Sequence, residues 1–106
     1  MKLLNHKLKM IFDSSVIQKF DSRIFDIDNQ IVICKFYLPQ SSTRWYVFAG
    51  EKYFDNDYLF FGAVHLGTDV KFGYFMFSDL KKIRGANRTR VIRDESVFNQ
   101  LYCNLY

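Results

Sequence analysis

The chain has 106 residues, 49% of them hydrophobic, and a formal net charge of +4. This length indicates one domain, and the hydrophobic fraction excludes a disordered chain. No apolar run reaches the ~18–20 residues of a membrane span, and the amino terminus lacks the unbroken apolar core of a signal peptide. We therefore expect a single cytoplasmic domain with no membrane partner.

The first 29 residues show the least regular pattern. Asp13 and Ser14 belong to the residue types that cap helices, and apolar residues follow them at helical spacing. We predict a short helix over residues 15–20. The alternation of polar and apolar residues over 23–28 predicts an additional edge strand.

Residues 30–80 hold four apolar, aromatic-rich segments, separated by polar breaks at 39–43, 54–57 and 67–69. A parallel crossover needs a dozen or more residues, so breaks this short predict antiparallel hairpins. Short helices are expected on either side of these strands. The sequence thus predicts an α+β fold whose antiparallel sheet has four or more strands.

The first strand indicates which side chains form the core. Its alternate residues are all apolar, which predicts one buried face. The members of that face are Val32, Cys34, Phe36 and Leu38. From the next two strands, we expect Trp45 and Phe60 to join Phe36 in the core or in an aromatic patch beside it.

The last part of the chain, residues 78–106, combines helical signals with positive charge. Ser78 can cap a helix and Gly85 can end it. The pattern from Asp94 to Leu105 predicts a second, final helix.

All of the excess positive charge lies in residues 81–93, which contain six bases and no acid. The bases are Lys81, Lys82, Arg84, Arg88, Arg90 and Arg93. The polar middle of this segment, residues 85–89, predicts a loop. Such a segment can bind a phosphate backbone or an acidic protein groove, and a solvated surface is the alternative. We also expect a local pairing between Arg93 and Asp94.

The sequence offers no evident reaction centre. Cys34 and His65 are the only candidates for a thiol–imidazole pair. Each lies on a predicted strand, so the two could face each other, but nothing in the sequence requires it. We expect His65 to be a surface or half-buried structural residue, and Cys34 and Cys103 to be reduced thiols. We predict no catalytic residue, no metal site and no cofactor.

Three aromatic residues on the predicted strands are candidates for a binding surface. Tyr46, Phe48 and Tyr74 would serve as interface anchors or stack on unpaired bases if they were exposed. Burial in the core is the alternative.

Several short motifs occur in a characteristic order. They are Lys35-Phe36, Trp45-Tyr46, Phe60-Phe61-Gly62, Gly73-Tyr74-Phe75, Leu80, Arg93-Asp94 and Phe98. In this order the chain resembles, over about residues 30–98, the domain of unknown function 2958. The chain departs from that family at Lys71 and Phe72, where the family tends to have an acidic residue before its Gly-Tyr pair. The amino-terminal segment is not covered by this resemblance.

The resemblance implies an accessory protein of a phage or plasmid, and it supplies no catalytic residues. We expect a non-enzymatic protein that binds and inhibits a nucleic-acid-handling host machine, such as a CRISPR nuclease or a restriction system. The expected partner is a host protein or ribonucleoprotein. The sequence also leaves open a homodimer. The alternative is a stand-alone DNA- or RNA-binding module that uses residues 81–93. A small hydrolase-like enzyme ranks third.

Overall fold

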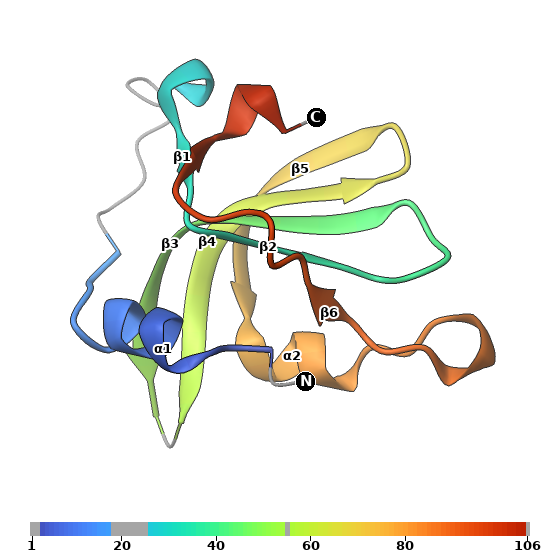
Figure 1. Ribbon diagram of the computed structural model, residues 1–106, viewed down its shortest axis with the longest axis horizontal. Coiled ribbons are helices and arrows are strands. Elements are labelled where there is room, and N and C mark those ends of the chain that lie inside the picture. The colour runs from blue at the N-terminus through green and yellow to red at the C-terminus, as the bar shows by residue number, and fades with distance from the viewer. Residues whose placement is uncertain (1–2, 18–25, 55, 106) are drawn as a thin grey trace.

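The computed structural model describes residues 3–17, 26–54 and 56–105 (Figure 1). Its main sheet has five strands in the order β5-β4-β3-β2-β6, and all neighbouring strands are antiparallel. The strands are β2 (Cys34–Tyr37), β3 (Thr43–Tyr53), β4 (Asp57–Leu66), β5 (Asp69–Met76) and β6 (Ile92–Arg93). A separate two-stranded ribbon pairs β1 (Ile31–Val32) with β7 (Gln100–Leu101). With short helices around this sheet, the predicted α+β fold is confirmed.

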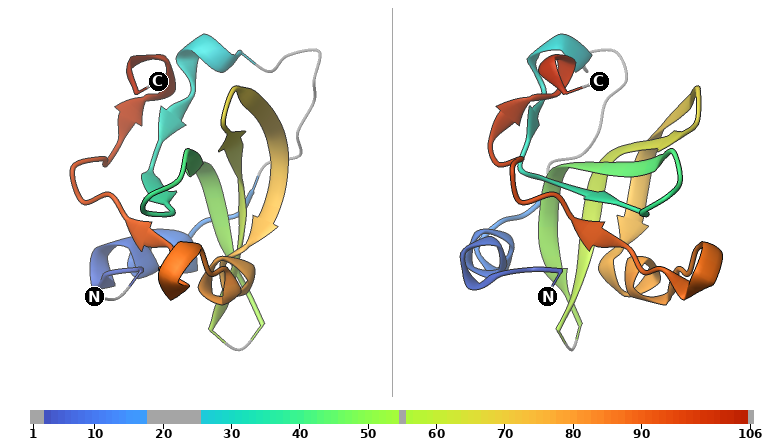
Figure 2. Two further views of the ribbon diagram at one scale, coloured as in Figure 1. Left: turned by 90° about the vertical axis from the view of Figure 1, so that its right-hand side faces the viewer. Right: turned by 45° about the vertical axis from the view of Figure 1, so that its right-hand side comes forward.

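Two α-helices and three 3₁₀ turns complete the described part of the chain. They are α1 (His6–Asp13), η1 (Ile27–Asn29), α2 (Phe77–Lys82), η2 (Ala86–Arg88) and η3 (Tyr102–Asn104). Figure 2 shows η1 and η3 together at one end of the molecule, while α1 and α2 lie toward the other end.

The three predicted breaks are the hairpin turns that join β2 to β5. Each turn contains a residue with positive φ, at Gln40, at Phe54 and Asn56, and at Gly67. This region of backbone space reverses the chain tightly and suits Gly and Asn best. The antiparallel prediction from the short breaks is therefore confirmed.

The first face of the main sheet, which α1 and α2 cover, is an aromatic core. Phe36 and Phe60 are fully buried there, and Trp45 is 6% exposed. Phe12 of α1 places its ring 5.0 Å from the Phe60 ring. The expectation that Phe36, Trp45 and Phe60 build the core is confirmed.

The second face of the main sheet is also buried, which the sequence did not indicate. Residues from β1 and η3 pack there, so Val32 and Tyr102 join Tyr46 and Phe48 in a second cluster. Both alternating sets of side chains in the middle of β3 are therefore inside the protein. This explains why the run from Trp45 to Phe48 is apolar without alternation.

Two local irregularities distribute side chains between these faces. Ile33 interrupts the strand between β1 and β2, so Val32 lies on the second face while Cys34 lies on the first. The predicted single face from Val32 to Leu38 is wrong for Val32 because regular alternation ends at this break. In β3 a bulge between Val47 and Ala49 shifts the pairing with β4.

The amino-terminal helix begins earlier than predicted. Asn5 is the N-cap of α1, and its side chain accepts a hydrogen bond from the Leu8 amide at 2.8 Å. Ser14, the predicted start, is the C-cap instead. Residues 15–17 are not helical, and the rest of the predicted helix lies outside the described residues. The helix begins after Asn5 and not after Ser14 because a helix at 6–13 buries Leu8 and Phe12 against the sheet.

The predicted edge strand over 23–28 is replaced at its end by a turn. The Asp26 side chain accepts from the Asp28 amide at 3.1 Å and begins η1. This local hydrogen bond competes with strand pairing. Residues 23–25 lie outside the described part of the chain.

Helix α2 confirms the prediction of a helix after the sheet, but its caps differ. Asp57, at the start of β4, accepts from the Ser78 amide at 2.9 Å, whereas Ser78 itself makes no capping bond. The helix ends at Lys82, before Gly85, whose φ of −100° is ordinary. Gly85 therefore does not end the helix in the left-handed conformation.

The predicted final helix over 94–105 is wrong. Asp94 accepts from the Ser96 amide and hydroxyl, which closes a turn instead. Asn99 has a φ of 51°, and the chain then forms β7 and η3. Pairing of Leu101 with Ile31 draws this segment into an extended conformation.

Candidate functional site: a basic ridge and an adjacent cavity

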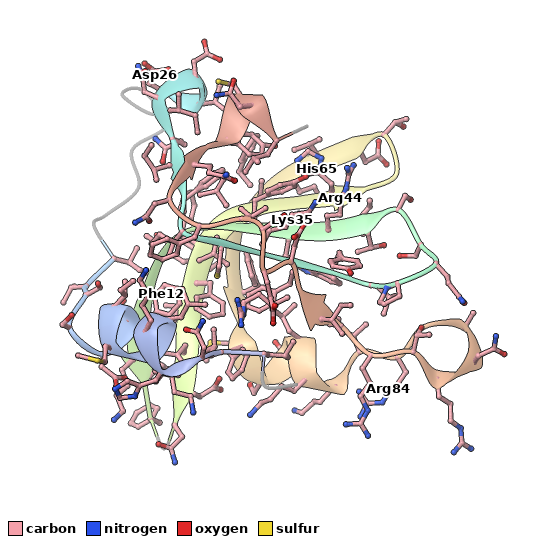
Figure 3. All side chains as sticks on the ribbon, in the orientation of Figure 1. Phe12, Asp26, Lys35, Arg44, His65 and Arg84 are labelled. Carbon is pink, nitrogen blue, oxygen red and sulfur yellow. The ribbon has the colours of Figure 1, made fainter. Side chains whose placement is uncertain are left out.

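Five of the six predicted cations are exposed at the end of α2 and on the hairpin that follows it, and we call this set the basic ridge. Its members are Lys81, Lys82, Arg84, Arg88 and Arg90. The first two belong to the last turn of α2, and the others belong to a hairpin that follows it. Figure 1 shows this hairpin projecting beyond the sheet, and Figure 3 shows Arg84 directed outward.

Backbone bonds hold the hairpin of the ridge in shape. Arg84 and Arg90 form an antiparallel bridge, and the Gly85 amide donates to the Thr89 carbonyl at 2.8 Å. Asn87 and Arg88 have φ angles of 56° and 60° at its tip. A Cβ on Gly85 would lie 2.6 Å from the Thr89 hydroxyl oxygen, so any larger residue would force the Thr89 side chain to move. The loop predicted from the polar middle of this segment is thus a closed turn.

The cations of the ridge differ in how tightly the protein holds them. The Arg84 guanidinium donates to the carbonyls of Lys81 and Ile83, at 2.7 and 2.9 Å. The Lys81 ammonium lies 4.8 Å above the Phe77 ring. The ion pairs between described residues join Lys35 to Asp94 and Arg93 to Glu95, so neither neutralises the ridge.

Arg93, the sixth predicted cation, is separate from the ridge. Its Nε donates to the Leu3 carbonyl at 3.0 Å, and its side chain is 10% exposed. It therefore ties the amino-terminal segment to β6. The expected pairing with Asp94 is wrong, because Asp94 pairs with Lys35 at 3.6 Å and Arg93 approaches Glu95. Consecutive residues along an extended chain point to opposite sides.

The predicted aromatic interface is wrong for two of its three members. Tyr46 is fully buried and Phe48 is 8% exposed, because η3 places Tyr102 over both. Tyr74, on the edge strand β5, is 53% exposed. Phe72 lies on the same strand and is 45% exposed, although its ring still contacts Phe48. Only the edge strand thus presents aromatic surface among these positions.

A cavity of about 580 Å³ lies beside the basic ridge. Its lining comes from the amino-terminal segment, α1, α2 and the strand after the hairpin. The lining residues are Leu3, Leu4, Lys9, Phe77, Leu80, Lys81, Arg90, Val91 and Ile92. Sequence reasoning missed this site, since its walls are far apart along the chain. The apolar pairs at 3–4 and 91–92 carry no signal by themselves.

A polar cluster is buried on the second face of the sheet. His65 is 3% exposed, and its Nε2 is hydrogen bonded to the Tyr102 hydroxyl. Burial lowers the pKa of His65, and the charges of Arg44 and Lys35 lower it further. Figure 3 shows His65, Arg44 and Lys35 in the same region. The expectation of a surface or half-buried histidine is therefore corrected to a buried one.

Cys34 and His65 do not form a nucleophilic pair. Cys34 is buried in the cluster of the first face, whereas His65 contacts Tyr46 and Tyr102 of the second. The sheet therefore separates thiol from imidazole. Burial raises the pKa of Cys34 to about 12, with the charge of Arg93 acting weakly in the other direction. The thiol is accordingly a poor nucleophile at neutral pH.

Neither a metal site nor a membrane helix is found in the described ranges. No three His, Cys, Asp or Glu side chains of residues 3–17, 26–54 and 56–105 are placed to hold a metal ion together. Within those same ranges, no helix is long and apolar enough to cross a membrane.

These features define a small α+β domain with a sheet whose central strands are buried on both faces and with a projecting cationic hairpin. The chain belongs to the DUF2958 family, described as a protein of unknown function, whose model matches residues 6–103. The match confirms the family resemblance and extends it into the amino-terminal segment. No curated protein and no solved structure matches the chain.

Proposed function

We propose that this is a non-enzymatic binding protein that docks on a nucleic-acid-handling protein or ribonucleoprotein through its basic ridge. The observation that carries the proposal is the set of five exposed cations on the end of α2 and on the projecting hairpin that follows it. Loops held by a rigid sheet often carry binding function, because they vary without disturbing the core.

The charge pattern supports a large anionic target. The ridge concentrates the net positive charge of the chain, while the remaining bases are outnumbered by acids. A surface of one sign steers an oppositely charged partner and speeds encounter. A machine that handles nucleic acid carries phosphate groups on its bound substrate, and these would attract the ridge.

A host defence nuclease is the target that we would test first. Resemblance to a family expected on phages and plasmids motivates this choice, and occlusion of such a nuclease would need no catalytic residue. The inhibition of a CRISPR or restriction enzyme is accordingly part of the proposal.

Direct binding to DNA or RNA is the second candidate. Asn87 lies exposed at the tip of the hairpin beside Arg88, and amide side chains donate to phosphate oxygens as arginines do. Such a mode would need no protein partner, and its affinity would fall steeply with salt.

The test compares the wild type with two charge-matched variants. Lys82→Glu/Arg88→Glu changes the ridge, whereas Lys52→Glu/Lys71→Glu makes the same charge change at exposed sites on the sheet. Each tagged protein is crosslinked in the native host and recovered before and after nuclease treatment. Each purified protein is also titrated with duplex and single-stranded oligonucleotides at several salt concentrations.

We expect the wild type and the sheet variant to retain a nuclease-resistant partner that the ridge variant loses. Nucleic-acid binding by the purified wild type, with a salt slope reduced by roughly one unit for each lost phosphate contact, would favour the second candidate. Equal recovery and equal oligonucleotide affinity in both variants would contradict the proposed function of the ridge.

A further inference from the structure

We infer that the cavity beside the ridge is a binding site for a small amphipathic anion, a ligand with an apolar body and one carboxylate or phosphate group. This inference goes beyond the proposed function and does not depend on it. It rests on the composition of the walls and on the positions of three cations around them.

Six of the nine residues that line the cavity are apolar. Phe77 and Leu80 of α2 contribute to it, and so do Leu4 and Val91 from two other segments. The volume of about 580 Å³ falls within the range of about 300–1,000 Å³ that is usual for small-molecule sites. Binding of an apolar group would remove these apolar side chains from water, which is favourable. An apolar ligand body would therefore be stabilised there.

Three cations line the same cavity, one from each of three segments. Lys9 comes from α1, Lys81 from α2 and Arg90 from the far arm of the hairpin. All three residues are exposed, so their charges lie toward the solvent side of the apolar walls. The described lining contains no carboxylate, and the Asp57 carboxylate, whose charge interacts with that of Lys81, lies outside it. An anion at the mouth would be attracted by all three charges.

The two features together specify the orientation of the ligand. Its apolar body would contact Phe77 and Leu80, and its anionic group would lie among Lys9, Lys81 and Arg90. The Lys81 ammonium, 4.8 Å above the Phe77 ring, already joins the apolar wall to the charged mouth. A neutral ligand would use only the walls, and an inorganic anion would use only the mouth.

The experiment is a titration of the protein with decanoate, followed by amide nuclear magnetic resonance shifts, with decanol as the uncharged control of equal chain length. We expect saturable shifts at residues 3–4, 77–81 and 90–92. Decanol carries no charge and so lacks the contacts with Lys9, Lys81 and Arg90. We therefore expect it to bind about tenfold more weakly than decanoate. Inorganic phosphate should compete only weakly.

Variants locate the charge contribution. Lys81→Gln/Arg90→Gln should weaken decanoate binding about three- to tenfold. Lys82→Gln/Arg88→Gln removes the same charge from ridge positions outside the cavity lining, and should change the affinity by less than about twofold at physiological salt. Leu3→Trp should fill the cavity and abolish binding. If this last variant does not fold, the two glutamine variants still decide the question.

The inference is overturned by absence of saturable binding, by shifts outside these three segments, or by equal affinities for decanoate and decanol. Equal loss in the two glutamine variants would also overturn it. Loss of decanoate binding in Lys81→Gln/Arg90→Gln alone supports the cavity site, whatever happens to the macromolecular partner of the ridge.

Discussion

The sheet and the basic ridge are built in opposite ways. In the middle of β3 and β4, side chains on both faces are buried, and contacts come from segments distant in sequence. The ridge takes its cations from one short stretch, residues 81–90, and all five are exposed. Stability should therefore depend on the sheet, whereas the ridge is free to serve an external contact.

The largest expected effect on stability comes from removing an aromatic ring between α1 and the sheet. Phe12 is fully buried and contacts the rings of Tyr58 and Phe60. Phe12→Ala should lower the free energy of unfolding by about 3–5 kcal/mol, measured by urea denaturation. Met10→Ala, on the exposed side of the same helix, should have little effect. A loss below about 1 kcal/mol for Phe12→Ala would show that α1 is not part of the core.

Gly62 tests the close approach of β3 and β4 at the bulge. A Cβ there would collide with the Tyr46 carbonyl oxygen, which belongs to the backbone and moves only if the strand moves. We expect Gly62→Ala to cost about 3 kcal/mol or more. Gly73→Ala on the neighbouring strand is the control, because a Cβ on Gly73 would meet no atom within 4 Å. Similar melting temperatures for both variants would refute the close approach.

Asp57 links the sheet to the element that carries the ridge. Burial acts to raise its pKa, but hydrogen bonds from Ser78 and Tyr58 and the charge of Lys81 outweigh burial, so the pKa is lowered. Asp57→Ala removes the cap of α2 and should cost about 1 kcal/mol of stability. Asp69→Ala, at an exposed turn, should cost less. Equal losses in the two variants would mean that the cap contributes nothing.

The buried histidine should make stability depend on pH in a narrow window. The pKa of His65 is lowered in the folded protein from its ordinary 6.5, so the unfolded chain binds the proton more readily. The contribution of His65 to the free energy of unfolding is complete above pH 6.5. It is lost as the pH falls through the lowered pKa that His65 has in the folded protein. Protonation of carboxylates affects the free energy of unfolding only below about pH 5. His65→Gln should flatten this slope, and an unchanged slope would contradict the burial of a neutral imidazole.

The sequence predicted the parts of the fold that depend on neighbouring residues. Asn56 and Gly67 mark turns by their own backbone preferences, so the hairpins of the sheet followed directly. The positions of exposed cations also followed, because a run of bases without acids is rarely buried.

The parts that depend on distant segments were not predictable in this way. Tyr46 and Phe48 are buried only because Tyr102 returns over them from the end of the chain. Arg93 is structural because it meets the Leu3 carbonyl, ninety residues away. The cavity is likewise formed by separate segments. No local pattern in the sequence indicates contacts between segments that are so far apart.

The contrast between the ridge and the sheet is tested most directly by measuring polyanion affinity and the free energy of unfolding in the same three proteins. Heparin, a polyanion, is used in column chromatography with Lys82→Glu/Arg88→Glu, Lys52→Glu/Lys71→Glu and the wild type, and each protein is also unfolded in urea. We predict that the ridge variant elutes at much lower salt than the equally charged sheet variant, while its free energy of unfolding stays within about 0.5 kcal/mol of the wild type. Identical elution of the two variants would contradict the claim that the ridge is a dedicated contact surface for anionic partners.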